Sequence, residues 1–187
     1  MASRPHPSSL APLVEHLRLH SFRTDGPFTL RSGEVSAWYI DARQTTFDGE
    51  GARLVGEAVA AALDPGVVAC GGLTMGADPI AVAAAIMAAD SGRSLRAFSV
   101  RQAAKDHGTG GRLVGPVRAG DVVALLDDTV TTGGALLEAL ACARDAGLVV
   151  GQVLTLVDRS AGVVAARMAA EGIPYTCLVT PGDLGVS

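Results

Sequence analysis

From residue 51 to the end of the chain, segments with a helical pattern alternate with segments typical of strands. The strand-like segments are short apolar runs rich in Val and Leu, whereas the segments between them carry Ala-rich apolar patterns with helical spacing. Strands that alternate with helices form a parallel sheet through right-handed crossovers. We therefore expect an α/β fold in which a central parallel sheet is flanked by helices on both faces. The expected strands are residues 66–70, 95–100, 121–127, 149–158 and 175–179, and the expected helices are residues 51–63, 78–90, 134–147 and 162–172.

The first 50 residues follow a different pattern. Residues 8–20 are typical of a short helix, and residues 27–41 contain two strand-like runs on either side of Ser32-Gly33, which favours a hairpin. No linker or internal repeat divides the chain, and 187 residues suit one domain. We expect a single domain over residues 1–187, in which residues 1–50 form a small helix-and-hairpin hood beside an α/β core of residues 51–187.

The composition argues against several classes of protein. A formal net charge of −4 disfavours general nucleic-acid binding. The apolar runs are too short to span a bilayer, and the N-terminus lacks the apolar core of a signal peptide. Cys70, Cys142 and Cys177 lie far apart without C-x-x-C spacing, which indicates small core residues in a reducing cytoplasm rather than disulfides or a zinc site. We therefore expect a cytoplasmic protein that binds neither nucleic acid nor membrane.

Three polar segments directly follow expected strands. They are GGLTMGAD at residues 71–78, RQAAKDHGTGG at residues 101–111 and DDTVTTGG at residues 127–134. In open parallel sheets, ligands bind at the carboxyl ends of the strands. The three segments should therefore border one ligand site.

The segment DDTVTTGG combines two kinds of group that a simple phosphate site would not combine. Backbone N–H groups at a helix N-terminus bind phosphate, whereas carboxylates repel it. The sequence has neither a Walker loop nor a G-x-G-x-x-G fingerprint. The combination predicts a ligand that carries a phosphate together with a group that carboxylates favour. Sugar hydroxyls, a metal ion and a developing positive charge are the candidates for this second group. A simpler alternative is an ordinary helix start, in which Thr132 caps the helix and both aspartates face solvent.

VVALLDDTVTTGG, residues 122–134, resembles the signature of type I phosphoribosyltransferases, which bind 5-phosphoribosyl 1-pyrophosphate (PRPP). The resemblance implies that Asp127 and Asp128 hold the ribose hydroxyls and act in catalysis, because carboxylates also suit the oxocarbenium-like charge that develops as pyrophosphate leaves. It implies that the following loop cradles the 5′-phosphate. The residues of this loop are Thr129, Val130, Thr131, Thr132, Gly133, Gly134 and Ala135.

Residues 101–115 resemble the catalytic loop of orotate phosphoribosyltransferases, R-K-x-x-K-x-H-G, with Gln102 in place of the usual lysine. The resemblance implies a mobile loop in which Arg101, Lys105 and His107 are catalytic and, together with Gln102, bind PRPP across a homodimer interface. Closure of such a glycine-rich loop would exclude water from the site. Without the resemblance, a solvated surface loop would be the favoured interpretation of the segment.

The hood carries a third resemblance to the same family. FTLRSGEVSAWYID, residues 28–41, is similar to the family's arm F-x-L-[KR]-S-G-x-x-S-x-Y-[FY]-x-[DN]. The resemblance implies that Arg31 contacts both PRPP and orotate and that Tyr39 and Ile40 border the flat pyrimidine. From the residues alone, an amphipathic hairpin with Trp38 or Tyr39 in a core is an alternative.

Two further segments complete the resemblance. GGLTMGADPIA, residues 71–81, is similar to a short loop that contacts pyrophosphate, which assigns Thr74 and Met75 to PRPP binding, chiefly through the backbone. In LVDRSAG, residues 156–162, Arg159 falls where the family's arginine reaches the orotate carboxylate, with Thr131 beside it. A guanidinium binds a carboxylate in bidentate geometry, which would separate orotate from uracil. An ordinary Asp–Arg surface turn is the alternative for Arg159.

Together these resemblances imply a type I phosphoribosyltransferase fold and the conversion of orotate and PRPP to orotidine 5′-monophosphate and pyrophosphate in pyrimidine biosynthesis. They imply Mg²⁺ as cofactor, carried mainly by PRPP and located near Asp128. A phosphoribosyltransferase for another base and a PRPP-sensing regulator without chemistry are the two alternatives.

Overall fold

A computed structural model of the chain describes residues 5–29, 35–103 and 111–186. Within these residues the central sheet has six strands in the order β10-β9-β8-β5-β6-β7. Neighbouring strands are parallel except for the pair β6 and β7, which is antiparallel. The expected α/β class and the mostly parallel sheet are confirmed. The strand bounds are β5 Ala69–Leu73, β6 Arg96–Val100, β7 Leu113–Val114, β8 Val122–Val130, β9 Val149–Asp158 and β10 Tyr175–Val179.

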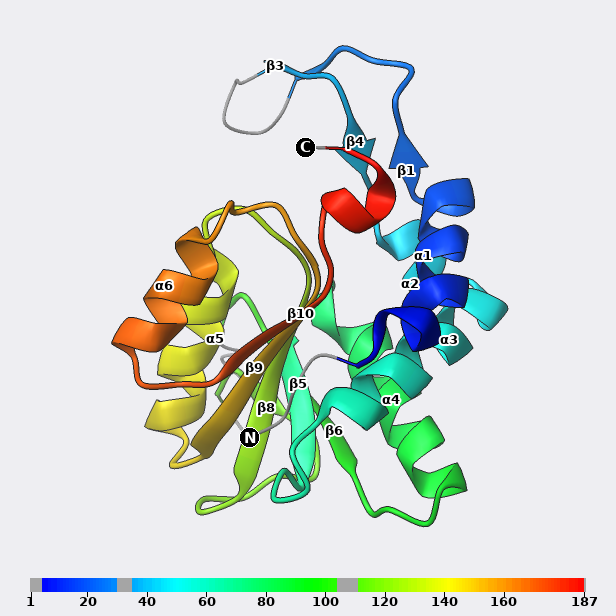
Figure 1. The fold of residues 1–187 in the computed structure, drawn as a ribbon. Helices are drawn as coiled ribbons and strands as arrows, with labels where there is room; N and C mark the ends of the chain where they lie inside the picture. The colour runs from blue at the N-terminus through cyan, green and yellow to red at the C-terminus, as the bar shows by residue number, and fades with distance from the viewer. Residues whose placement is uncertain (1–4, 30–34, 104–110, 187) are drawn as a thin grey trace.

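Helices cover both faces of the sheet (Figure 1). On one face lie α1 (Pro7–His20), α3 (Gly49–Ala62) and α4 (Ala77–Asp90), and on the other lie α5 (Gly134–Asp145) and α6 (Val163–Ala170). Successive side chains of a strand point to opposite faces. In β8, Ala124 and Leu126 join the first hydrophobic cluster while Val123 and Leu125 join the second, so both faces are apolar, as a doubly covered sheet requires.

The hood contains the expected helix and hairpin together with elements that the sequence pattern does not indicate. The pair β2 (Phe28–Thr29) and β3 (Val35–Ser36) is antiparallel, as a hairpin requires; the expected turn at Ser32-Gly33 lies outside the described residues. The pair β1 (Phe22–Arg23) and β4 (Tyr39–Ile40) was not predicted. Neither was the short helix α2, Arg43–Thr46, which precedes α3.

The hood packs on the α/β core through α1 and the end of the chain. Leu10, Leu13 and Leu17 of α1 are buried in the same cluster as Leu154 and Leu178 of the sheet. The 3₁₀ turn η1 (Gly182–Leu184) follows β10, and Arg18 donates a hydrogen bond to its last carbonyl, Leu184 O, at 3.3 Å. None of the helices in the described residues is long and apolar enough to cross a membrane.

Two strands end later than the sequence pattern predicts. The expected strand of residues 66–70 is displaced to β5, so Gly71 and Gly72 lie inside the sheet. A Cβ atom there would come within 2.0 Å of Phe98 O and 2.1 Å of Leu126 O, respectively, which explains why both positions are glycine. The expected strand 121–127 continues as β8 to Val130, because the long β9 pairs with it up to Asp158.

Candidate active site

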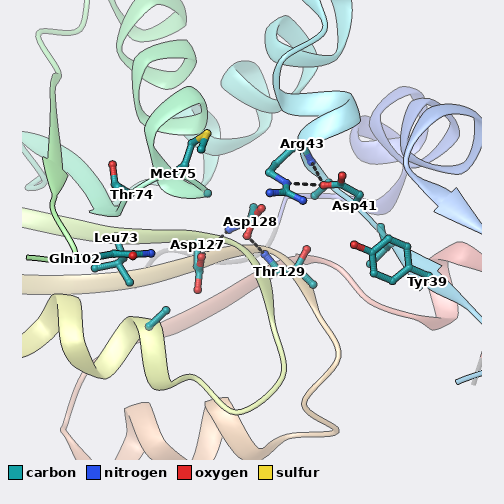
Figure 2. A pocket seen from close by; sticks show the side chains of 14 residues that line it. Tyr39, Asp41, Arg43, Leu73, Thr74, Met75, Gln102, Asp127, Asp128 and Thr129 are labelled. Atoms are coloured by element: carbon teal, nitrogen blue, oxygen red, sulfur yellow. Dashed lines mark hydrogen bonds and ion pairs between the residues drawn. The ribbon is translucent and has the colours of Figure 1, made fainter. Parts of the chain in front are cut away.

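A cavity of about 490 Å³ opens at the carboxyl ends of β5 and β8, beside the hood (Figure 2). The end of β4 and the start of α2 form its hood side, and the loop between β5 and α4 lies opposite. Residues from all three polar segments that were expected to border one ligand site therefore line this cavity. The lining residues are 39–43, 73–76, 102, 127–129 and 135.

Asp127 and Asp128 lie at the base of this cavity inside β8. They are successive residues of a strand, so their side chains leave on opposite sides, as Figure 2 shows. The backbone N–H of Asp128 donates to Asp127 Oδ1 at 3.1 Å, and that of Thr129 donates to Asp128 Oδ1 at 2.7 Å. A Cβ at Gly76 would lie 2.7 Å from Asp128 Oδ1, so a glycine is needed for the β5–α4 loop to approach this carboxylate.

The two carboxyl groups are costly to ionise at this position. Burial, and then the negative charge of Asp128, raise the pKa of Asp127 to about 7. Burial also raises the pKa of Asp128, although the N–H of Thr129 and the charge of Arg43 oppose this. Hydroxyl donors or a positive centre in the cavity would stabilise the charged forms. The alternative in which both aspartates face solvent is therefore wrong, since Asp127 is only 9% exposed.

The loop after β8 leads into the N-terminus of α5. The N-cap is Gly133, with φ of 76°, and no side chain caps the helix, so Thr132 is not a capping residue. The first N–H groups of a helix have no partner within it, and Ala135 of this first turn lines the cavity. The hydroxyl of Thr129 is buried without a hydrogen-bond partner among the described residues. This end of the cavity therefore offers donors suited to an anion.

The other predicted residues fall into three groups. Tyr39, Ile40, Thr74, Met75 and Gln102 line the cavity with the aspartates, Thr129 and Ala135. The lining does not include Arg101, Val130, Thr131, Thr132, Gly133, Gly134 or Arg159. Arg31, Lys105 and His107 lie outside the described residues.

Arg159 lies between the sheet and the hood. Its backbone N–H donates to Val130 O at 2.8 Å, which joins its turn to the end of β8. Its guanidinium carbon lies 3.8 Å from the centroid of the Trp38 ring, and Nη2 donates to Ser36 Oγ at 3.4 Å. The alternative of an isolated surface turn is thus wrong for Arg159.

Asp41 and Arg43 were not predicted and also line the cavity. Arg43 Nε donates to Asp41 Oδ1 at 2.7 Å, and Figure 2 shows the guanidinium above Asp128. Arg43 is the one cationic side chain among the described lining residues. The sequence feature that could have identified them is their position directly after Tyr39 and Ile40, in an arm already expected to contact the ligand.

The ends of residues 101–112 are fixed beside α5. Arg101 N donates to Arg112 O at 2.8 Å, and Arg112 Nε donates back to Arg101 O at 2.7 Å. Arg112 also forms an ion pair with Glu138 of α5. The segment that begins with Arg101 and Gln102 therefore starts next to the helix whose N-terminus borders the cavity.

The described residues contain no group of three His, Cys, Asp or Glu side chains placed to hold a metal ion. Mg²⁺ commonly takes only one or two carboxylates together with phosphate oxygens of a substrate. Asp127 and Asp128 provide carboxylate oxygens of that type in the cavity.

Several known proteins that are similar to this chain in sequence and fold are orotate phosphoribosyltransferases. No family model matches the chain. An orotate phosphoribosyltransferase of Corynebacterium glutamicum is 43% identical over 181 residues, which cover 96% of this chain and 94% of that protein. An orotate phosphoribosyltransferase of Thermosynechococcus vestitus is 44% identical over 160 residues, which cover 85% of this chain and 84% of that protein. The crystal structure of Mycobacterium tuberculosis orotate phosphoribosyltransferase in complex with PRPP matches with a TM-score of 0.76 at 33% identity, over 95% of this chain and 99% of that one.

Proposed function

The chain belongs to the orotate phosphoribosyltransferase family, and from this premise we propose how its own residues share the reaction. The chain is a pentosyltransferase that joins N1 of orotate to the anomeric carbon of PRPP, forming orotidine 5′-monophosphate and pyrophosphate in pyrimidine biosynthesis. The two alternatives, another base and a regulator without chemistry, are disfavoured because relatives covering most of the chain share this one activity.

Asp127 and Asp128 bind the ribose of PRPP and stabilise the positive charge that develops at its anomeric carbon. The observation that carries this proposal is the position of two carboxylates, largely buried, at the base of the cavity beside a helix N-terminus. Their raised pKa values mean that their charge is poorly solvated, so a cationic transition state gains more from them than it would from solvated carboxylates. Orotate N1 is a nucleophile once deprotonated, so this assignment requires no protein base that attacks carbon.

The loop 129–135 holds the 5′-phosphate of PRPP. Support comes from the N-terminus of α5, where the N-cap Gly133 provides no side-chain cap, and from the Thr129 hydroxyl, which has no partner among the described residues. The exposed side chains of Thr131 and Thr132 offer two more hydroxyl donors. Helix dipole and N–H groups together favour a dianionic phosphate at this position.

Arg43 supplies part of the positive charge that meets the pyrophosphate. Three acidic side chains, Asp41, Asp127 and Asp128, line the same cavity, so a polyanionic substrate needs nearby cations. Gln102 and Met75 line the cavity without charge. The remaining cations would come from Arg101 and from Lys105 and His107 of the catalytic loop.

Orotate lies between the hood and the turn after β9. Tyr39 and Ile40 border the pyrimidine ring from the hood side of the cavity. Arg159 binds the carboxylate, with Thr131 beside it and Arg31 contributing to both substrates. The hydrogen bond from Arg159 N to Val130 O supports this arrangement, because it joins the base-binding turn to the phosphate loop.

Asp128 would be the carboxylate that helps to hold Mg²⁺, which PRPP would carry on its diphosphate. The donor set fits this role, since the cavity offers two carboxylates but the described residues form no closed metal site. The ion would neutralise charge on the leaving pyrophosphate.

The enzyme acts as a homodimer in which loop 101–115 serves the partner's site. A shallow groove of about 180 Å³ beside β6 and β7 supports this, because its lining is mostly apolar and includes exposed Val82 and Val114. Ile86, one turn after Val82 on α4, is 54% exposed. The groove adjoins β6 and the edge strand β7, between which residues 101–112 lie in the sequence, so a copy seated there would face the two described ends of this segment. Exposed apolar patches commonly mark such interfaces.

The cytoplasm is the compartment that fits the cysteines. Cys70, Cys142 and Cys177 are all unpaired, and free thiols persist in reducing compartments.

The activity is tested by mixing the protein with PRPP, orotate and Mg²⁺ and measuring pyrophosphate release. We expect release with orotate and none with uracil or hypoxanthine. In a thermal-shift series, orotate should raise the melting temperature while the other two bases should not. Release with a different base would assign another specificity, and PRPP binding without release would support the regulator.

A further inference from the structure

Trp38 of the hood and Arg159 of the β9–α6 turn form a stacked pair across the two parts of the molecule. The guanidinium carbon is 3.8 Å from the ring centroid, well inside the range of a cation–π contact. Ser36, two residues before Trp38, accepts a hydrogen bond from Arg159 Nη2 at 3.4 Å. One short hood segment therefore contacts the side chain of Arg159 at its face and at its edge.

The main chain of Arg159 is fixed independently of this pair. Its N–H donates to Val130 O, and Asp158 Oδ1 accepts the N–H of Ser160 at 2.6 Å. The Tyr175 hydroxyl donates to the second oxygen of Asp158 at 2.8 Å. These bonds hold the turn, but a long arginine side chain has many rotamers even on a fixed backbone. The contact with Trp38 therefore helps to set the direction of this side chain.

Trp38 is itself held firmly enough for this purpose. Its ring packs against Phe22 at a centroid distance of 5.7 Å and joins the partly buried edge of the main hydrophobic cluster. The Ser36 hydroxyl donates to Trp38 O at 2.7 Å and accepts the Trp38 N–H at 3.3 Å, which closes a tight turn. The ring thus presents a fixed aromatic face.

Stacking suits an arginine that must bind a carboxylate. A guanidinium binds a carboxylate with two N–H groups in its own plane. An ion pair with an acidic side chain would occupy such N–H groups, whereas an aromatic ring contacts only the face of the plane. Trp38 can therefore fix the plane of Arg159 without competing with the ligand.

We propose that Trp38 is a positioning residue for base selectivity, which orients the Arg159 guanidinium toward the carboxylate of the base. The proposal rests on the proposed function of Arg159. Under this proposal, recognition of the base depends on the folding of the hood. The aromatic ring comes from the turn between β3 and β4, whereas the guanidinium comes from the turn between β9 and α6.

The chain has a single tryptophan, so its intrinsic emission reports on this pair directly. In the protein without substrates, Arg159→Met should change the intensity or wavelength of Trp38 emission, because the cation leaves the ring. An exposed arginine on α3, Arg53→Met, serves as the control and should leave the emission unchanged. Unchanged emission in Arg159→Met would overturn the stacked pair.

Kinetics test whether the pair sets selectivity. Trp38→Leu should raise KM for orotate about 3- to 30-fold, the range of a cation–π contact, with little change in KM for PRPP or in kcat. Trp38→Phe keeps a ring against Phe22 but a weaker π face, so it should fold normally and show a smaller rise. Phe22→Leu weakens the support of the Trp38 ring without removing the ring, so it should lower thermal stability and raise KM for orotate less than Trp38→Leu does.

A double-mutant cycle identifies the route of the effect. If Trp38 acts through Arg159, then Trp38→Leu should have no further effect on KM for orotate in the Arg159→Met background. Additive effects, an equal rise in KM for PRPP, or the same change in Phe22→Leu would overturn the positioning role while leaving that of Arg159 intact. An unchanged KM for orotate in Arg159→Met alone would instead reject the proposed function of Arg159, and the positioning role with it.

Discussion

Asp127 and Asp128 are joined by a hydrogen bond from the backbone N–H of Asp128 to Asp127 Oδ1, at 3.1 Å, while their carboxylates lie on opposite sides of β8. This geometry gives neighbouring acids different surroundings. Asp127 is the more deeply buried of the two, and Asp128 lies below the guanidinium of Arg43. The two carboxylates should therefore respond differently to replacement.

Asp128→Asn should lower kcat by roughly 10- to 1000-fold with a smaller change in KM for PRPP, because the amide keeps the size but loses the charge that stabilises the transition state. Steady-state kinetics with both substrates varied would measure this. Asp145→Asn removes an exposed carboxylate near the end of α5 and should leave kcat unchanged. A kcat close to that of the wild type in Asp128→Asn would reject the role of this carboxylate.

Asp127 should make the stability of the free protein depend on pH. Its pKa is about 7 in the fold against an ordinary value of 3.8, so the folded state holds an additional proton between these values. The free energy of unfolding therefore falls as pH rises from about 4 to about 7, by as much as about 4 kcal/mol, and is level above that window. In Asp127→Asn this fall should be absent, so the variant gains stability relative to the wild type toward about pH 8.

Urea unfolding at about pH 5 and about pH 8 would measure this difference. Asp145→Asn, which removes an exposed carboxylate, should retain the pH dependence of the wild type. Parallel pH profiles for the wild type and Asp127→Asn would contradict the raised pKa.

The sequence pattern predicted the sheet well because buried parallel strands are continuous apolar runs, and β9 and β10 have the predicted bounds. It failed where a polar or glycine-rich segment is held in the sheet by its neighbours. Asp128 and Thr129 continue β8 only because β9 supplies partners. Gly71 lies in β5 because it pairs with β6 and β8, and it is a glycine because Phe98 O leaves no room for a side chain.

The site could be predicted where chemistry is local in sequence, as in the acidic pair followed by a phosphate loop. It could not be predicted where a residue acts through a partner distant in the chain. Arg43 has no motif of its own and is recognised only by its place above Asp128. The sequence pattern offers a core position for either Trp38 or Tyr39 as an alternative, and the contact of Trp38 with Arg159 depends on how the hood packs on the sheet.

Arg43→Gln should raise KM for PRPP about 10-fold or more, the cost of a lost hydrogen bond to a charged group, with a smaller effect on KM for orotate. The same change on α3, Arg53→Gln, removes an arginine that pairs with exposed Glu50 and Glu57 of the same helix and should have no kinetic effect. Isothermal titration with PRPP and Mg²⁺ would give the affinity directly. Equal PRPP affinity in Arg43→Gln and the wild type would remove Arg43 from the pyrophosphate site.

Tyr175→Phe should destabilise the protein by about 1–3 kcal/mol, because Asp158 Oδ2 and the buried Thr155 hydroxyl each lose their hydrogen bond to Tyr175. Burial raises the pKa of Tyr175, so its hydroxyl stays a donor across the working pH range. Thr155→Val keeps the bond between Tyr175 and Asp158, so it should cost less in urea unfolding and leave KM for orotate unchanged. If Tyr175→Phe does not raise KM for orotate, the bond to Asp158 serves stability alone.

The last prediction concerns which subunit's site loop 101–115 serves. Lys105, which lies outside the described residues, would reach the partner's Asp128 if the loop crosses a two-fold interface. Lys105→Ala and Asp128→Asn should each be nearly inactive alone. After mixing and subunit exchange, about half of the dimers are heterodimers, and each would hold one site with both defects and one with neither. Roughly a quarter of all sites should then recover wild-type activity.

A loop that serves its own subunit predicts a different result, because every site in the mixture would still carry one defect. Native mass spectrometry must first establish that subunits exchange between dimers. A mixture of Lys105→Ala with wild-type protein provides the reference for the rate of this subunit exchange. Val82→Glu, placed on the exposed apolar groove of α4, should weaken the dimer and abolish the recovery, because the shared site requires the interface. Proven exchange without recovered activity would reject the shared site, whereas recovery near a quarter requires both the dimer and the crossing loop.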